Sequence, residues 1–500
     1  MKNVLAETIA AGRFCYVAEL VASGTKTEAQ VLDVASALAT VPEIGTVSVT
    51  NYAGGKAGHD PIRIATGVQA AGLTANVHVT CVSQDRAGLK RTIAELQTLD
   101  LFNVFALSGD WPKNEGASPV FDIDSVQLAQ FIAETRTRTG APFHISVAVS
   151  PFKYNREDCL YQYLKLEKKA LAGADLAITQ VGWDAKKFVE LKRYVDEHGL
   201  TMPLLGNVYV LGLKAAERMS GGNPPGCWAS PELVAAIREE SKAADGGLSA
   251  RLDRAAKSVA ILRGLGYAGV YLGGTHDPKQ LSHILRRAEE LAPQWEACMN
   301  DLQFGDAKGF YLYEKPTLPK PRPTIIPLTL DLVGNTLPVP WSKTSPDTWL
   351  RRRIEGLFTW IDRHPLLSKV FERFEYHGKR VAFGCKNCGN CVLGSMEYVC
   401  PQTCPKQMRN GPCGGTYLGK CEVIDQPCIW VSVMERAEAS NRLADLKTYI
   451  PPPDRALEGT SSWLNFYLQR DSRPGRPRAD LIPHATTLPA TDHRPLTTGH

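Results

Sequence analysis

The chain has 500 residues, of which 44% are hydrophobic and 22% are charged. This length favours two or three domains, and the composition is that of a globular protein. A formal net charge of +5 is small for this size, so it gives no argument for nucleic-acid binding. The sequence has no run of 18 apolar residues and no clear signal peptide, so we expect a cytoplasmic protein that does not span a membrane.

Residues 1–295 alternate between short apolar runs rich in β-branched residues and amphipathic helical stretches. Eight runs are expected to be strands: RFCYVAEL, GTVSVTNY, ANVHVTCVS, FNVFALSGD, FHISVAVSP, LAITQVGW, MPLLGNVYVL and GYAGVYLGG. Between them, the helical stretch 86–99 places Leu89, Ile93, Leu96 and Leu99 on one face. Eight strands, each followed by a helix, predict an α/β fold of the (β/α)8 TIM-barrel type, and a doubly wound open sheet is the alternative.

The rest of the chain changes character after the last predicted strand. A Pro-rich stretch cannot be one regular helix, residues 345–378 are expected to be helical with Ser345 or Asp347 as N-cap, and residues 431–449 form a closing helix. We therefore expect four regions: a barrel over 1–300, a linker over 301–345, a smaller cysteine-rich metal-binding domain over 346–450, and a largely disordered tail over 451–500.

Polar residues where the predicted strands end are candidates for a site at the barrel rim. Glu19 ends an apolar strand, where burial would raise its pKa and suit a general acid, although a structural ion pair is the equal alternative. Thr50 also lies at a strand end, and His78 is either a site residue or a core histidine. Asp110 binds a ligand or caps a helix, and Gln180 can donate and accept hydrogen bonds. These residues predict a small polar ligand and do not name the reaction.

Seven segments resemble the catalytic barrel of the methylenetetrahydrofolate reductase family over residues 10–295, in the family's order. They are YVAEL, VSVTNYAGG, VHVTCVSQDRAGL, VFALSGDWP, ISVAVSP, LKLEKKALAGADLAITQ and LLGNVYVLGLKAAERM. The resemblance implies a bound flavin, FAD or FMN, and reduction of 5,10-methylenetetrahydrofolate to 5-methyltetrahydrofolate by hydride transfer from the flavin. The implied electron donor is NAD(P)H or a ferredoxin-like protein, and the oligomeric state stays open.

The resemblance also implies roles for individual residues. Glu19 matches the acid that protonates N10 of the folate, Asp110 matches the aspartate between flavin and pterin, and Gln180 matches a folate-contacting glutamine. The implied flavin contacts are Thr50, His78, Ser108, Gly109, Asp110, Ala148 and Lys169. Leu213 aligns with an aromatic residue that stacks on NADH in bacterial members, as part of the substrate site.

Three departures from the family pattern affect these expectations. Ser108 stands where the family has an arginine in Arg-Gly-Asp, which removes a cationic flavin contact. The segment KYNRED follows SPF, in place of the His-Pro-Glu-Ala that grips the adenosine side of FAD, so FMN stays open. Leu213 in place of an aromatic residue puts the usual NADH stacking in doubt.

Eight of the thirteen cysteines lie within residues 385–428, and the other five are scattered over residues 1–300. In a long chain without an export signal this clustering indicates metal ligation rather than disulfides. The spacing C-x2-C-x2-C-x8-C-x3-C-x8-C-x7-C-x6-C favours one or two [4Fe–4S] clusters, with zinc sites as the alternative. The predicted ligands are Cys385, Cys388, Cys391, Cys400, Cys404, Cys413, Cys421 and Cys428.

Residues 320–435, with RNGPCGG and GKCEV as the most specific part, resemble a C-terminal domain fused to or partnering some methylenetetrahydrofolate reductases. This implies that the domain passes electrons to the barrel flavin from a donor such as ferredoxin. A structural zinc adaptor is one alternative for this domain. A second alternative, for the whole chain, is a tetrahydrofolate-dependent methyltransferase or demethylase that has no flavin.

Overall fold

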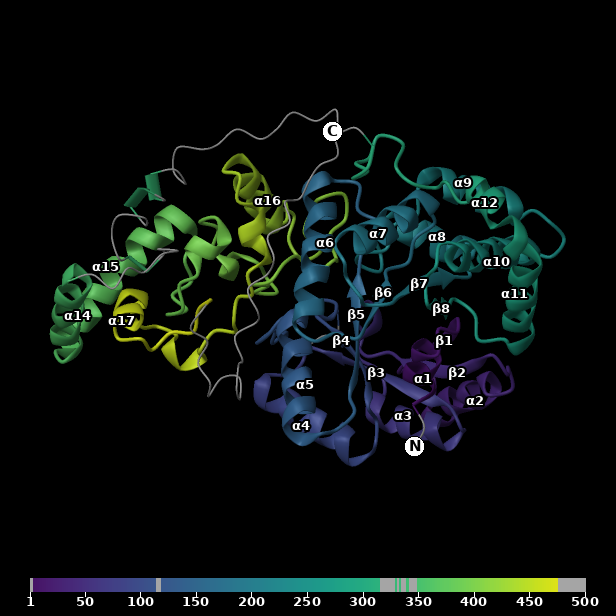
Figure 1. Ribbon diagram of the computed structural model, residues 1–500, viewed down its shortest axis with the longest axis horizontal. Coiled ribbons are helices and arrows are strands. Elements are labelled where there is room, and N and C mark those ends of the chain that lie inside the picture. The colour runs from purple at the N-terminus through teal and green to yellow at the C-terminus, as the bar shows by residue number, and fades with distance from the viewer. Residues whose placement is uncertain are drawn as a thin grey trace.

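The computed structural model describes residues 3–113, 118–314 and 349–474, together with 329–330, 332–333 and 339–340. Figure 1 shows a barrel formed by the first half of the chain and a mainly helical second part beside it. The long helix α6 (Arg156–Leu171) stands at the boundary between the two parts, next to α16 (Ile429–Ala439).

Eight parallel strands close into a barrel in chain order, with β1 paired to both β2 and β8. Their bounds are β1 Cys15–Leu20, β2 Ile44–Val49, β3 Thr74–Thr80, β4 Asn103–Leu107, β5 His144–Val149, β6 Leu176–Thr179, β7 Leu204–Tyr209 and β8 Gly269–Gly273. All seven residues of β3 are buried, as expected for parallel strands covered on both faces. The TIM-barrel prediction is confirmed, and the β1–β8 pairing excludes the open sheet.

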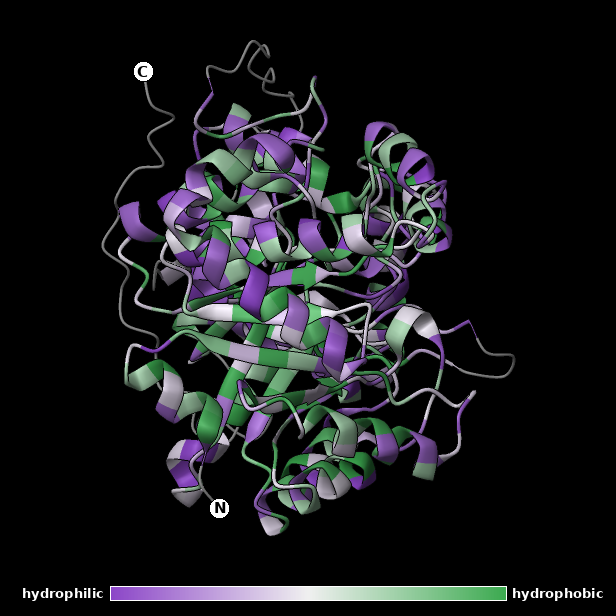
Figure 2. Cartoon of the chain, turned by 90° about the vertical axis from the view of Figure 1, so that its right-hand side faces the viewer, coloured by the Kyte–Doolittle hydropathy of each residue, from purple (hydrophilic) through white to green (hydrophobic). Residues whose placement is uncertain are grey.

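The outer layer of the barrel consists of helices whose apolar sides face the strands, which Figure 2 shows as green strands inside and purple helical surfaces outside. Besides α6, their bounds are α1 Val4–Ala10, α2 Glu28–Leu38, α3 Pro61–Ala70, α4 Arg86–Thr98, α5 Ser125–Thr139, α7 Ala185–Glu197, α8 Leu213–Ser220, α9 Pro231–Glu240, α10 Leu248–Gly264, α11 Pro278–Leu291 and α12 Trp295–Cys298. Three of the four predicted face residues of α4 are buried, but Leu99 is the residue after the helix and is 38% exposed.

The barrel extends past the predicted boundary at residue 300. Leu302 and Phe310 are buried, and the backbone N–H of Ala185 donates to the Leu302 carbonyl oxygen at 2.8 Å. Residues 301–314 therefore pack on the barrel rather than form a linker. Most of the remaining predicted linker lies outside the described residues.

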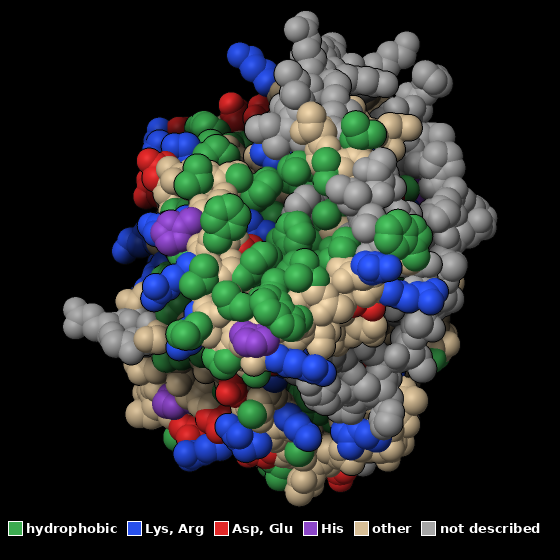
Figure 3. Space-filling view, turned by 90° about the vertical axis from the view of Figure 1, so that its left-hand side faces the viewer, with side chains coloured by type: hydrophobic (Ala, Val, Ile, Leu, Met, Phe, Trp, Pro, Cys, Tyr) green, Lys and Arg blue, Asp and Glu red, His purple; other side chains and the backbone are tan. Residues whose placement is uncertain are grey.

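The predicted helix over 345–378 is two helices, α14 (Trp349–Asp362) and α15 (Pro365–Phe383). The break precedes Pro365, since proline lacks an N–H and clashes with the preceding turn of a helix. The suggested N-caps Ser345 and Asp347 lie outside the described residues. The outward sides of α14 and α15 carry a patch of apolar side chains, visible in Figure 3.

The predicted closing helix over 431–449 is also shorter than expected. Helix α16 ends at Ala439, and a 3-10 turn at Leu443–Lys447 follows it. The chain then continues in ordered structure to α17 (Ser462–Tyr467).

The expectation of disorder from residue 451 onward is wrong for residues 451–474. Leu464, Phe466 and Tyr467 are buried, and the Tyr467 ring stacks on Phe358 of α14 with centroids 4.5 Å apart. The aromatic residues of α17 bury enough apolar area to order this segment. The Pro- and Arg-rich composition of the whole tail gave no sign of that. Residues 475–500 lie outside the described part of the chain.

Of the helices formed by the described residues, none is both long enough and apolar enough to cross a membrane.

Candidate active site

A cavity of about 620 Å³ opens at the end of the barrel where the strands finish. Small-molecule sites usually measure ~300–1,000 Å³, and TIM-barrel enzymes place them at this end. Every strand except β2 contributes lining residues, and Thr50 directly follows β2. The sequence-predicted residues in the wall are Glu19, Thr50, His78, Ser108, Gly109, Asp110, Ala148, Lys169 and Gln180. Lys406 and residues 412–415 of the cysteine-rich segment complete the wall, so both parts of the chain form the cavity.

Glu19 lies near the end of β1, with its carboxyl group facing this cavity. Burial raises the pKa of the carboxyl to about 7, and a hydrogen bond from the Tyr271 hydroxyl on β8 opposes the rise. Among the described residues no lysine or arginine contributes to this shift, so the structural ion pair considered from the sequence is not what holds Glu19 there. A carboxylic acid with a pKa near 7 is able to donate a proton at neutral pH.

Asp110 lies on the loop after β4 and accepts a hydrogen bond from the Gly54 N–H at 2.9 Å. The loop after β2 comes this close because Gly55 has a φ of 78°, and a Cβ there would lie 2.1 Å from the Trp111 carbonyl oxygen. Burial raises the pKa of Asp110 to about 6, and the charge of Lys406 opposes the rise. Asp110 therefore faces the cavity and is not a helix cap.

His78 and Lys169 lie deeper in the cavity wall. Burial lowers the pKa of His78 to about 3, so the ring is neutral, and its Nε2 lies 3.0 Å from the Ser48 Oγ. Burial also lowers the pKa of Lys169 well below its usual range, and its ammonium group donates to the Ala148 carbonyl oxygen. Thr50 Oγ1 accepts from the Ala22 N–H at 3.2 Å. Each polar group is thus held in place by the barrel itself.

Gln180 and Leu213 have different positions relative to the cavity. The side-chain oxygen of Gln180 accepts from the Val181 N–H at 2.8 Å, and the residue lines the cavity. Leu213 begins α8 and packs against the core, and it is not a lining residue. Helix α8 instead contributes Ala215, Arg218 and Met219 to the wall.

The cavity wall contains polar atoms that no other described residue satisfies. Ser150 Oγ, the side-chain nitrogen of Gln162 and the side-chain oxygen of Asn207 are buried, lack a hydrogen-bond partner, and belong to lining residues. Buried polar groups normally have partners, so these atoms indicate that a polar ligand belongs in the cavity. None of these three residues was predicted from the sequence, and neither was Tyr271, although the strand alternation in GVYLGG could have placed Tyr271 at the rim.

The side chain of Lys406, from the cysteine-rich part, contacts the segment Ser108–Asp110, which stands where the family has Arg-Gly-Asp. Its ammonium donates to the Gly109 carbonyl oxygen at 2.7 Å and forms an ion pair with Glu422, in which both side chains are only 3% exposed. The neighbouring Ser108 hydroxyl donates to the Met408 sulfur at 3.7 Å. A positive charge therefore lies beside the position where the family's arginine is missing, and it comes from a residue almost 300 positions later in the chain.

Asp124 fixes this cysteine-rich segment on the barrel. One of its carboxylate oxygens caps α5 through the backbone N–H groups of Val126 and Gln127. The other accepts from the backbone N–H groups of Arg409 and Asn410, at 3.2 and 2.9 Å, and from the Asn410 side chain at 3.0 Å. Asp124 is 1% exposed, so one buried carboxylate joins the two parts of the chain.

Helix α6 forms the largest part of the contact between the two parts. All residues from Asp158 to Lys169 are buried, because one side of α6 packs on the barrel and the other on α16. The Tyr161 and Trp430 rings meet edge to face, with centroids 4.7 Å apart. The Lys165 ammonium donates to the Pro412 carbonyl oxygen at 2.8 Å, which fixes the turn that lines the cavity.

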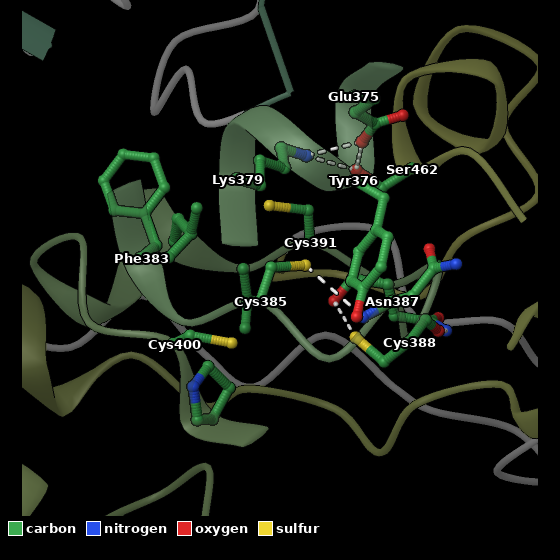
Figure 4. A pocket seen from close by; sticks show the side chains of 15 residues that line it. Glu375, Tyr376, Lys379, Phe383, Cys385, Asn387, Cys388, Cys391, Cys400 and Ser462 are labelled. Carbon is green, nitrogen blue, oxygen red and sulfur yellow. Dashed lines mark hydrogen bonds and ion pairs between the residues drawn. The ribbon is translucent and has the colours of Figure 1, made fainter. Parts of the chain in front are cut away.

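The eight clustered cysteines form no disulfide and separate into two sets. Cys385, Cys388, Cys391 and Cys400 line one small pocket, around which their sulfur atoms lie in Figure 4. The pKa of Cys400 is raised to about 12, chiefly by burial and in addition by the other three thiols of this set. No group of three or more Cys, His, Asp or Glu side chains in the described residues is placed to hold a metal ion.

The second set consists of the last four cysteines, Cys404, Cys413, Cys421 and Cys428. The pKa of Cys413 is raised to about 12, chiefly by burial. The charge of Lys406 opposes the rise, and Glu422 and Cys404 contribute to it. The Gly415 N–H donates to the Cys413 sulfur within the turn NGPCGG. Cys413 also lines the large cavity, so this set adjoins the candidate active site.

Two family models match this chain. Residues 4–221 match the model described as Methylenetetrahydrofolate reductase, and residues 364–456 match the one described as Methylene-tetrahydrofolate reductase C terminal. These two parts of the chain belong to the methylenetetrahydrofolate reductase family. The first match includes β1 to β7, and the second includes all eight clustered cysteines.

Curated methylenetetrahydrofolate reductases match only the barrel region in part. The 5,10-methylenetetrahydrofolate reductase of Salmonella typhimurium is 26% identical over 151 residues, which are 30% of this chain and 48% of that protein. Methylenetetrahydrofolate reductase 2 of Schizosaccharomyces pombe is 29% identical over 137 residues, which are 25% of this chain and 21% of that protein. The chain thus spans less than half the length of these relatives.

Proposed function

We propose that this chain is a flavin-dependent reductase that converts 5,10-methylenetetrahydrofolate to 5-methyltetrahydrofolate in the cytoplasm. The single observation that carries the proposal is the position of the Glu19 carboxyl group. It has a pKa of about 7 and lies inside a cavity with unsatisfied polar atoms. Family membership and the names of the Salmonella and fission-yeast relatives support the substrate and the reaction class.

The protein's own contribution is to bind the folate and to supply a proton. Glu19 donates its proton to N10 of the folate, which opens the five-membered ring, and the Tyr271 hydroxyl holds the carboxyl in place. Asp110 and Gln180 bind the pterin by hydrogen bonds, and both line the cavity. When bound, the flavin would supply the hydride. The protein orients the folate and the flavin and provides the electrostatic environment of the site.

The flavin fits the polar wall between β2 and β6. Thr50, His78, Ala148 and Lys169 would hold it, together with Ser108 and Gly109, and all six line the cavity. We favour FMN over FAD because the segment KYNRED stands where the family binds the adenosine of FAD. In this chain KYNRED contacts the cysteine-rich part instead. The Lys153 ammonium of this segment donates to the Thr416 carbonyl oxygen at 2.6 Å and so docks the cysteine-rich part.

The dependence of turnover on pH tests this proposal. Because Glu19 must be protonated to act, we expect the rate of 5-methyltetrahydrofolate formation to be level below pH 7. Above the pKa of about 7 it should fall about tenfold per pH unit. The assay uses protein loaded with FMN or FAD, titanium(III) citrate as reductant, and chromatographic quantification of the product.

Two results would contradict the proposal. The first is the absence of 5-methyltetrahydrofolate at every pH from protein that retains its flavin. The second is a rate that stays level up to pH 9, because the acid would then not be a group with a pKa near 7. The Glu95→Gln variant, which changes an exposed carboxylate on α4, serves as the matched control and should keep the profile.

We further propose that the two sets of four cysteines hold iron–sulfur clusters that pass electrons towards the flavin. The support is that each set supplies four thiols, the number that one [4Fe–4S] cluster takes. A four-iron core is larger than a single ion, so its thiolates need not meet at one point as zinc ligands do. Cys413 of the second set also lines the cavity, which brings that set next to the flavin's site.

Metal and sulfide content distinguish clusters from zinc. Protein purified without oxygen should contain about four iron and four acid-labile sulfide per set of cysteines. The Cys388→Ser variant should lose the iron of the first set and keep that of the second. Stoichiometric zinc with no iron would contradict the relay and favour a structural zinc domain.

A further inference from the structure

The outward face of α14 and α15 exposes an unusual amount of apolar surface. Among the described residues, eight of the twelve large hydrophobic side chains that are exposed lie on these two helices. They are Trp349, Leu357, Trp360, Leu366, Leu367, Val370, Phe374 and Val381. Figure 3 shows that apolar side chains gather on this side of the molecule, with basic side chains near them. Exposed apolar patches of this kind mark interaction sites.

Helix α15 is apolar on two sides, whereas a helix at the surface of a monomer needs one apolar side. Its inner side packs through Phe371 against Phe358 of α14. Its outer side carries Leu366, Val370 and Phe374 at intervals of four residues, and they are 81%, 65% and 81% exposed. Side chains four residues apart share one face of a helix. The outer stripe is therefore a surface that the described residues leave uncovered.

The charge of this face is one-sided. Within residues 349–386 seven Lys and Arg side chains are exposed, namely Arg352, Arg353, Arg363, Lys369, Arg373, Arg380 and Lys386. The four acidic residues of the same range, Glu355, Asp362, Glu372 and Glu375, are only partly exposed, and each is bonded within the protein. The exposed apolar side chains of these two helices therefore lie among exposed basic side chains, and such a surface is complementary to an acidic partner.

The same helix borders the first set of cysteines. Tyr376, Lys379 and Phe383 of α15 line the pocket that contains Cys385, Cys388, Cys391 and Cys400 (Figure 4). An α-helix with its side chains is about 10 Å thick, so a protein on the outer side of α15 would lie close to this pocket.

We propose that the outward face of α14 and α15 binds an acidic electron-carrier protein, which delivers electrons to the set Cys385–Cys400. This inference rests on the proposed function, in which that set holds a redox-active cluster. Two carrier molecules are each oxidised by one electron for every 5,10-methylenetetrahydrofolate that takes up two electrons and two protons. The reductant that we propose is a ferredoxin or a flavodoxin, because each of these proteins can give one electron at a time.

A second copy of this chain and a lipid surface fit the observations less well. Self-association through this face would bring two sets of exposed basic side chains together, and like charges across an interface are unfavourable. An anionic membrane would match the charge, but nothing in membrane binding requires a neighbouring set of four thiols. The electron carrier accounts for the apolar stripe, the charge and the position together.

The test measures binding of an acidic [2Fe–2S] ferredoxin, and in parallel a flavodoxin, to the full-length holoprotein by calorimetry. We expect at least one of them to bind, and more weakly at higher salt. Phe374→Ser should raise the Kd about tenfold or more, as loss of a central aromatic anchor does. Arg373→Glu should also weaken binding. The matched controls are Leu418→Ser, at a residue 62% exposed elsewhere, and Arg91→Glu on α4, and both should bind like the wild type.

Four results would overturn the proposal. They are no binding of either carrier, equal binding by Phe374→Ser and the wild type, dimerisation that Phe374→Ser abolishes, and binding to phosphatidylglycerol vesicles that Phe374→Ser abolishes. Product formation with titanium(III) citrate is measured on the same sample. If product forms but no carrier binds, the docking face is wrong and the proposed function stands. If a carrier binds at this face but no product forms, the proposed function fails instead.

Discussion

The Glu19→Gln variant is expected to form 5-methyltetrahydrofolate ~10²–10⁴ times more slowly than the wild type, the usual contribution of a positioned general acid. Glutamine has nearly the same shape and keeps a hydrogen-bonding partner for Tyr271, but it has no proton to give to N10. The fold and the flavin site should be unaffected, because neither depends on an ion pair of Glu19. The measurement is the initial rate of product formation under anaerobic conditions, with flavin content determined in parallel.

The control and the contradicting result are both well defined. Glu95→Gln makes the same chemical change at an exposed residue of α4 and should retain the wild-type rate. A Glu19→Gln variant with bound flavin and an unchanged rate would remove Glu19 from the mechanism, and another proton donor would then be required.

The second large effect is expected at Asp124. Replacing it with alanine leaves four buried backbone N–H groups without their acceptor, those of Val126, Gln127, Arg409 and Asn410. The Asn410 side chain loses one of its two hydrogen bonds. Each unsatisfied buried donor costs about 1–3 kcal/mol unless water replaces the acceptor, so we expect a loss of about 3–5 kcal/mol. The cysteine-rich segment should detach from the barrel before the barrel unfolds.

Limited trypsin digestion measures this detachment directly. Lys406 and Arg409 are only 2% and 1% exposed, so trypsin should cut there slowly in the wild type and much faster in Asp124→Ala. Asp277→Ala is the matched control, because Asp277 caps α11 through the same two positions and, among the described residues, accepts no hydrogen bond from another segment. The control should lose about 1 kcal/mol and keep the wild-type cleavage pattern. Equal cleavage of the two variants would show that Asp124 does not hold the segment.

The barrel and much of its site could be predicted from the sequence because both depend on local patterns. Each strand is a short apolar run, and the residue at its end faces the rim whatever the helices do. Glu19 was recognisable because a carboxylate at the end of such a run is unusual, and the structure places it in the cavity. Leu213 was expected in the substrate site because of the family resemblance alone. Its helix α8 instead directs Ala215, Arg218 and Met219 to the cavity wall.

The contribution of the second part to the site could not be predicted in this way. Helix α6 has many charged residues and reads as a solvent-exposed helix, yet it is buried because α16 covers it from far along the chain. Lys406 lies between two cysteines and gives no local sign that its ammonium reaches Gly109. Contacts between residues about 300 positions apart depend on how the two parts dock, which no local periodicity records.

The central claim is that this barrel reduces 5,10-methylenetetrahydrofolate with a proton from Glu19, and a single-turnover experiment tests it most directly. Protein loaded with FMN, or with FAD in a second sample, is reduced with a stoichiometric amount of titanium(III) citrate and mixed with the folate without oxygen. We expect one 5-methyltetrahydrofolate for each bound flavin from the wild type and almost none in the same time from Glu19→Gln. No product from wild-type protein that retains its reduced flavin would contradict the account.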